Sequence, residues 1–132
     1  MLQIDIFDIL VRSRLKRYLL TAYITKIYRQ ILLKPNDCAY QHILWRESPE
    51  EEVIEYELRT ITYGVTSAPY LAIRCLHELD AQAGSKLPAA KNILTRQTYV
   101  DDVVGADTEF ELSIIQRDII GLLNSCGCTL KK

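Results

Sequence analysis

Two adjacent aspartates, Asp101 and Asp102, are the residues of this chain best suited to chemistry. An apolar, β-branched stretch beginning at Thr98 leads into them, and a second one leads out to Gly105. This pattern predicts a strand, a tight turn and a strand, with both carboxylates at the tip of a hairpin. Neighbouring like charges are best tolerated in water or around a divalent cation. The pair therefore indicates either a solvated turn or a metal site.

Length and composition predict one domain with a core of its own. The 132 residues are 48% hydrophobic and 25% charged, as in ordinary globular proteins. The start of the chain carries Asp5 where a signal peptide carries bases, and no apolar run approaches the roughly 18 residues that cross a bilayer. We therefore expect an intracellular protein, cytoplasmic or nuclear, that is neither secreted nor inserted in a membrane.

The charges are unevenly distributed, although the net charge of −1 argues against a generic nucleic-acid binder. The segment from Ile9 to Lys34 contains no acid and seven bases, which are Arg12, Arg14, Lys16, Arg17, Lys26, Arg29 and Lys34. The segment from Glu47 to Glu57 contains six glutamates. The basic segment is suited to a phosphate backbone, or it is the solvated face of a helix, and both interpretations stay open.

The cysteines are Cys38, Cys75, Cys126 and Cys128. Together with His42 and His77 they could in principle assemble a zinc site, but their spacing fits no known zinc finger. Buried, reduced thiols are the favoured interpretation.

The spacing of apolar residues predicts the remaining elements. In the first half these are a helix over 2–15, a central strand over 18–24 buried on both faces, an extended stretch over 28–33, and a hairpin of 40–46 with 53–62. In the second half they are helices over 66–82 and 86–95, the aspartate hairpin, a helix over 108–125 and a strand over 128–131. The helix over 108–125 has a capping box at Thr108 and Glu111 and an apolar stripe of Phe110, Ile114, Ile115, Ile119, Leu122 and Leu123.

This order of elements predicts an α+β fold. Without the hairpin between Tyr28 and Thr62, the order is β-α-β-β-α-β, which folds as a ferredoxin-like antiparallel sheet with helices on one face. The first strand and the central hairpin are neighbours in such a sheet. We therefore expect the strand end, Ala22 to Ile24, to lie beside Asp101 and Asp102.

Three motifs of the chain resemble the signature sequences of reverse transcriptases. The stretch 99–102 (Tyr-Val-Asp-Asp) resembles their catalytic hairpin, 63–70 resembles the glycine-containing motif of their nucleotide pocket, and 22–31 resembles their first catalytic motif. The amino-acid sequence, including residues 44–46 and 68–74, most resembles that of reverse transcriptases from the BEL/Pao class of long-terminal-repeat retrotransposons. The resemblance covers nearly the whole chain, with the motifs in the family's order and spacing.

The resemblance implies that residues 1–132 are a polymerase palm with a small fingers-side β-hairpin inserted at about 29–63. It implies the activity of an RNA-directed DNA polymerase, a nucleotidyltransferase that uses two Mg²⁺ (or Mn²⁺) ions about 4 Å apart. The implied partners are an RNA or DNA primer–template and deoxynucleoside triphosphates. Peptidase, RNase H and integrase parts of a polyprotein are further partners that the family implies, whereas a membrane is not.

The resemblance also implies roles for individual residues. Asp101 and Asp102 match the catalytic, metal-binding pair, and the backbone carbonyl of Ile24 matches a further metal ligand. Tyr28 matches the aromatic residue that crowds a ribose 2′-hydroxyl and so favours deoxynucleotides. Tyr63 and Gly64 match residues that line the nucleotide pocket, where glycine permits close approach of the backbone.

The chain departs from the family pattern at the third metal ligand. Relatives have aspartate where this chain has Tyr23, and usually glutamate where it has Thr25. A phenol is neutral at pH 7 and offers at best one weak oxygen ligand, so the residue expected to bridge both metals is missing.

The family also has a thumb, which is expected to follow Lys132 and is absent from these residues, and most of its fingers are expected to precede Met1. We therefore expect polymerase activity to be lost or severely reduced. A non-catalytic nucleic-acid-binding module and a protein-interaction domain are the alternatives.

Overall fold

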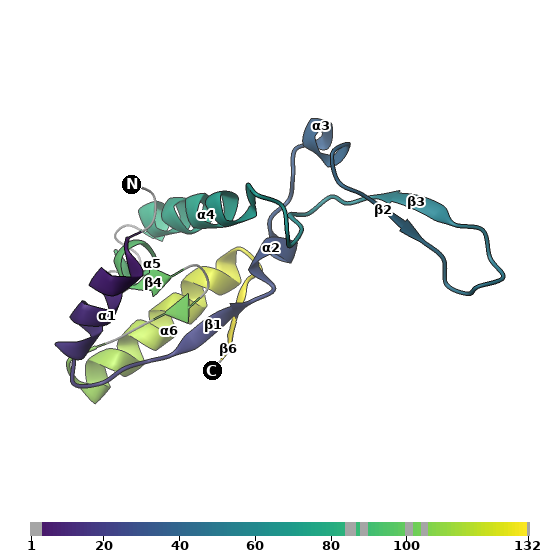
Figure 1. Ribbon diagram of the computed structural model, residues 1–132. Coiled ribbons are helices and arrows are strands. Elements are labelled where there is room, and N and C mark those ends of the chain that lie inside the picture. The colour runs from purple at the N-terminus through teal and green to yellow at the C-terminus, as the bar shows by residue number, and fades with distance from the viewer. Residues whose placement is uncertain (1–3, 84–86, 88–89, 100–101, 104–105, 132) are drawn as a thin grey trace.

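The computed structural model describes residues 4–83, 87, 90–99, 102–103 and 106–131, with Asp102 and Val103 described by their backbone alone. The first elements along the chain are α1 (Ile6–Arg14), β1 (Ala22–Thr25), α2 (Ile27–Gln30), α3 (Pro35–Cys38), β2 (His42–Trp45) and β3 (Ile54–Glu57). They are followed by α4 (Ala68–Ala83), α5 (Ile93–Arg96), β4 (Thr98–Tyr99), β5 (Asp102–Val103), α6 (Glu109–Ser125) and β6 (Thr129–Lys131). The fold is α+β (Figure 1).

The main sheet has the strand order β4-β5-β1-β6, and each neighbouring pair is antiparallel. With α4 after β1 and α6 after β5, the elements follow the predicted β-α-β-β-α-β order. Strand β1 lies between the β4–β5 hairpin and β6, which confirms that the first strand and the hairpin are neighbours. Two regions distant in sequence therefore meet at β1.

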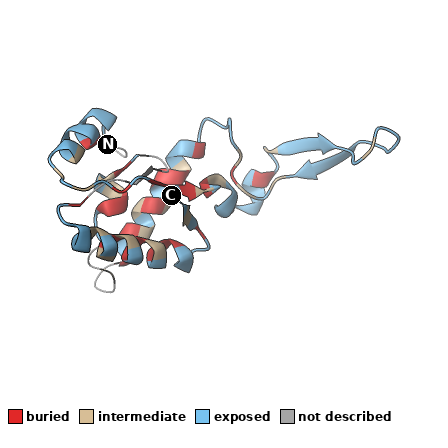
Figure 2. Ribbon diagram, turned by 90° about the horizontal axis from the view of Figure 1, so that it is seen from below, coloured by how far each residue is buried: buried red, intermediate tan, exposed pale blue. Residues whose placement is uncertain are grey.

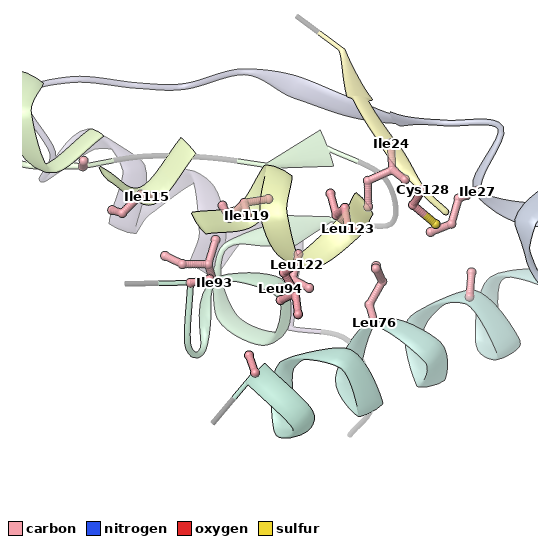
Figure 3. Packing of buried hydrophobic residues seen from close by; sticks show 14 residues of the cluster. Ile24, Ile27, Leu76, Ile93, Leu94, Ile115, Ile119, Leu122, Leu123 and Cys128 are labelled. Atoms are coloured by element: carbon pink, nitrogen blue, oxygen red, sulfur yellow. The ribbon is translucent and has the colours of Figure 1, made fainter. Parts of the chain in front are cut away.

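The hydrophobic core lies between one face of this sheet and the helices α4 and α6 (Figure 3). Ile24 from β1 packs in the same cluster as Leu76 of α4 and Ile119 of α6. Along β1 the burial alternates, and Tyr23 is 44% exposed between two buried neighbours. The prediction of a strand buried on both faces is therefore wrong, because α4 and α6 cover one face and Tyr23 lies on the other.

Helix α6 begins at the predicted cap. The side chain of Thr108 accepts a hydrogen bond from the backbone N–H of Glu111 at 3.1 Å. The Glu111 carboxylate reaches back to the N–H of Asp107 at 3.2 Å, one residue before the expected partner of a capping box. Ile115, Ile119, Leu122 and Leu123 of the predicted apolar stripe pack in the core. Phe110 is 76% exposed, because it lies in the first turn, beyond the core.

The prediction of a helix over 86–95 is wrong, because residues 87 and 90–92 are not helical. Residues 86, 88 and 89 lie outside the described residues. The helix formed is the single turn α5, which begins only after Asn92, a residue with a φ of 64°. Buried Asp80 holds this start in place, because its Oδ2 accepts hydrogen bonds from the Asn92 N–H at 3.1 Å and from Thr95 Oγ1 at 3.2 Å. A tertiary contact therefore sets where α5 begins.

The expected extended stretch over 28–33 is also wrong at its start, where α2 forms a helical turn. This turn follows Lys26, which has a φ of 51°, and it buries Ile27 in the core. The later part is extended, since Leu32 forms an isolated β-bridge with Thr60. These contacts bring the two ends of the inserted segment together.

The predicted hairpin is formed by β2 and β3, and each of its eight paired residues is exposed. It extends away from the main sheet at the end of the molecule opposite α1 (Figures 1 and 2). The core cluster includes none of its residues. Within the described part of the chain, no helix combines the length and the apolar character that a membrane crossing requires.

Candidate functional site

The register of the sheet aligns four positions of the candidate catalytic site in one row. Tyr99 is paired with Asp102, Asp102 with Tyr23, and Tyr23 with Lys131. Directly paired residues of antiparallel strands share a face, so Tyr23, Tyr99 and Lys131 lie on the exposed face of the sheet. The pairing of Tyr23 with Asp102 thus confirms that the first strand and the β4–β5 hairpin are neighbours. Asp101 lies outside the described residues.

Tyr23 is the residue at which the resemblance predicts a third carboxylate. Its ring is on the exposed face, and its Cα partner across the sheet is Asp102. Between Ile9 and Lys34 the sequence contains no acid that could take over the position. In the described part of the chain no three His, Cys, Asp or Glu side chains are grouped as metal ligands.

The donor set that the sequence offers for the predicted metal site, Asp101, Asp102 and the phenol of Tyr23, does not fit a pair of divalent cations. Mg²⁺ prefers charged or strongly polar oxygen ligands in octahedral geometry, and a neutral phenol supplies neither the charge nor a second oxygen. Ile24, whose carbonyl is the fourth candidate ligand, is paired with Leu130 of β6 and has its side chain fixed in the core.

The candidate nucleotide-binding residues come together beyond the end of β1. The rings of Tyr28 and Tyr63 are in edge-to-face contact, with centroids 4.8 Å apart and an interplanar angle of 72°. Gly64 follows with a φ of 86°, a conformation that favours glycine, and the position of its absent Cβ has no atom within 4 Å. The space beside Gly64 is thus open to a ligand.

Two bases that sequence reasoning did not assign to this place complete it. Lys26, Arg29 and Tyr63 line a hollow of about 550 Å³ on the surface. Lys26 follows Tyr23 by three residues, so the hollow begins where β1 ends. The signal in the sequence was the acid-free run of bases, but only the helical turn of α2 puts Lys26 and Arg29 beside Tyr63. An aromatic side chain with two cations is suited to a phosphorylated, ring-containing ligand.

A second cationic hollow, of about 490 Å³, lies between α1 and the residues that directly precede β4. Its lining includes Arg12, Lys16 and Arg96, and one acid, Asp107. Lys16 is paired with the Asp107 carboxylate, whereas Arg12 and Arg96 are exposed and form no ion pair within the described residues. The hollow therefore has an excess of positive charge.

The cysteines form no zinc site with the histidines. His42 lies on the projecting hairpin, where its Nδ1 is 2.8 Å from Glu55 Oε1. All four cysteines are free, as expected of reduced thiols, although Cys126 is exposed. Cys75, Cys126 and Cys128 line one mostly apolar groove of about 380 Å³, a grouping that sequence spacing did not reveal.

The environment of this groove disfavours thiolates. Burial, with smaller contributions from the hydrogen bond to Cys126 and from the nearby thiols, raises the pKa of Cys128 to about 12. Burial also raises the pKa of Cys75, as does Cys126, while Arg74 lowers it. These thiols are therefore poor nucleophiles near neutral pH.

No protein-family model and no curated protein sequence matches the chain.

Proposed function

We propose that this chain is the palm region of a BEL/Pao-type reverse transcriptase in which nucleotidyl transfer has been lost or severely reduced. The observation that carries the proposal is the register that pairs Tyr23, in the first motif, with Asp102, in the Tyr-Val-Asp-Asp motif. These residues are 79 positions apart in the sequence, from 23 to 102, and a family with this site requires them to be neighbours. The β-α-β-β-α-β order, with a hairpin inserted after α2, supports a palm with a fingers-side insertion.

The contact of Tyr28 with Tyr63 supports a nucleotide pocket of the same family. In this proposal Tyr28 excludes a ribose 2′-hydroxyl, Tyr63 packs against the nucleotide, and Gly64 leaves room for it. Lys26 and Arg29 neutralise the phosphates, since they line the hollow together with Tyr63. Nucleotide binding therefore does not depend on the metal ligand that Tyr23 replaces.

Primer extension on poly(rA)/oligo(dT) with Mg²⁺ tests the loss of activity. We expect no DNA synthesis, because losing one of three charged ligands weakens the metals and the transition state together. Synthesis that disappears in the Asp101→Asn variant would refute the loss of activity. The palm assignment is tested separately, by metal binding.

For metal binding, the Tyr23→Asp variant is titrated with Mn²⁺ and the free ion is followed by electron paramagnetic resonance. A third carboxylate beside position 102 is expected to tighten Mn²⁺ binding at least about tenfold, since it adds a charged oxygen ligand. Tyr40→Asp is the matched control, because it adds the same charge at an 87% exposed position outside the main sheet. Equal affinity in both variants would mean that Tyr23 is not the position of the missing ligand.

A second function, nucleic-acid binding without catalysis, is favoured by the hollow of Arg12, Lys16 and Arg96. It predicts that affinity for a primer–template duplex falls steeply with salt and falls further in the Arg12→Ala/Arg96→Ala double variant. Arg46→Ala, which removes a base from the acidic hairpin, is the control and should leave affinity unchanged. If the affinity for the duplex changed neither with ionic strength nor in the double variant, this function would be excluded.

A further inference from the structure

The β2–β3 hairpin has one face that is entirely apolar. Its register pairs Ile43 with Tyr56 and Trp45 with Ile54, and these four side chains share a face because the pairs are two residues apart. They are between 42% and 58% exposed. An isolated two-stranded hairpin is marginally stable in water, and a contiguous exposed apolar patch of this kind marks an interface. This apolar hairpin face is thus suited to contact with a partner.

The charge around this face indicates the chemistry of the partner. From Arg46 to Glu57 the hairpin has six glutamates and a single base, and Arg46 itself donates a hydrogen bond to the carbonyl of Pro49 at 2.9 Å. Such a surface repels a phosphate backbone. It is complementary to a surface that is apolar and basic.

Helix α1 of the same chain presents such a surface. Phe7, Leu10 and Val11 are 69%, 55% and 44% exposed, at the i, i+3 and i+4 spacing that places them on one side of the helix. Arg14 follows one turn later on that side, and Arg17 lies just beyond the helix. Ile9 turns inward and is buried, so this outer face of α1 is distinct from the cationic hollow that Ile9 and Arg12 line.

A single chain cannot bring these two surfaces together. Helix α1 and the β2–β3 hairpin lie at opposite ends of the molecule, with the main sheet between them (Figures 1 and 2). Contact between them must therefore join two copies.

We propose that the apolar hairpin face of one copy docks on the outer face of α1 of a second copy. The glutamates at the hairpin tip, Glu50, Glu51 and Glu52, then lie beside Arg14 and Arg17. Such an interface is head-to-tail, so it produces rings or open chains rather than a symmetric dimer. The two surfaces present only four and three hydrophobic side chains, which places the contact among weak, transient interfaces. This self-association is independent of the polymerase proposal, because it uses neither the sheet face of Tyr23 nor the nucleotide hollow.

Sedimentation equilibrium of the full chain, from about 1 to about 100 µM at low salt, tests the proposal in the range expected of a weak interface. The weight-average mass should rise above that of one chain as concentration increases, and the rise should shrink in 1 M salt, which screens surface charges. Trp45→Ser should weaken the association at least about tenfold, since buried tryptophans dominate interface energies.

Charge reversal makes the test specific. The variants Glu50→Lys/Glu51→Lys/Glu52→Lys and Arg14→Glu/Arg17→Glu should each be monomeric, because each has two surfaces of like charge. Their equimolar mixture should associate, because both pairings between the variants are complementary. Lys91→Glu changes an exposed charge outside both surfaces and should associate like the unaltered chain. Circular dichroism checks that every variant is folded.

A single-chain mass for the unaltered protein at all concentrations would overturn the proposal. So would a mixture that stays monomeric, or association that persists undiminished in both charge-reversed variants.

Discussion

At the scale of single residues, position 23 contributes little to the packing of the main sheet. Tyr23 is exposed on one face of β1, while its neighbours Ala22 and Ile24 supply the packing on the other. Exchanging a side chain at an exposed strand position changes stability by about 1 kcal/mol or less through β-propensity. Aspartate at position 23 is therefore compatible with the fold, so under the proposed function an exchange of aspartate for tyrosine would remove a ligand without disturbing the sheet.

A second residue-scale feature is the thiol of Cys128, whose pKa is raised to about 12 chiefly by burial. We expect iodoacetamide at pH 8.5 to alkylate Cys128 on the order of 100-fold or more slowly in the native protein than in urea, because the thiolate is the reactive form. Mass spectrometry with fragment-ion assignment separates it from exposed Cys126. Equal rates in both states would show that the thiol is not protected.

The same raised pKa links Cys128 to stability at high pH. In the unfolded chain the thiol loses its proton near 9.0, whereas in the folded protein it keeps the proton until about 12. The folded state therefore binds more protons between these values, so this contribution to the free energy of unfolding is complete below about pH 9.0 and is lost as the pH rises toward 12.

At the scale of elements, only part of the apolar stripe of α6 packs in the core and contributes to stability. Ile119 is 0% exposed and packs in the core, while Phe110 of the same helix is 76% exposed. Ile119→Ala should lower the free energy of unfolding by about 2–5 kcal/mol through lost burial and a cavity. The matched control Phe110→Ala should change it by about 0.5 kcal/mol or less.

Urea unfolding followed by circular dichroism measures both α6 variants. Comparable losses in the two would mean that the first turn of α6 is covered by a contact outside the described core. That result would bear on the packing of α6 alone, since the Thr108 cap is a separate interaction.

At the scale of the whole molecule, the β2–β3 hairpin is an appendage to the main sheet. The Leu58 N–H donates to the carbonyl of Gln41 at 2.8 Å, so the two ends of the hairpin are already adjacent. Replacing residues 42–57 with Asn-Gly, a sequence suited to a two-residue turn, should leave the melting temperature within a few degrees, because the deleted residues contribute nothing to the core cluster.

Calorimetry of this shortened chain provides the measurement. Loss of the cooperative transition would show that the hairpin supports the sheet from which it projects. The shortened chain also lacks one of the two docking surfaces, so it should be monomeric even at high concentration.

Much of this architecture was accessible from local patterns. The sequence predicted α1, α4, α6, the β2–β3 hairpin and the β-α-β-β-α-β order, because amphipathic spacing, turn residues and the Thr108 cap act over a few neighbouring residues. It failed at α2 and α5. There Lys26 and Asn92 adopt left-handed conformations that burial of Ile27 and the hydrogen bonds to Asp80 sustain, and such contacts are not visible in short-range spacing.

By itself the sequence determined the chemistry available to this protein. It set two aspartates in a strand–turn–strand pattern, a tyrosine where the resemblance implies a third carboxylate, a glycine beside Tyr63 and an acid-free basic segment. The tertiary structure alone decided which of these residues meet. It paired Tyr23 with Asp102, put Lys26 and Arg29 beside Tyr63, and separated α1 from the hairpin by the length of the molecule. The reason is physical: a side chain's type and its local propensity belong to its own stretch of chain, whereas strand register and convergence arise only when distant segments bury a common core.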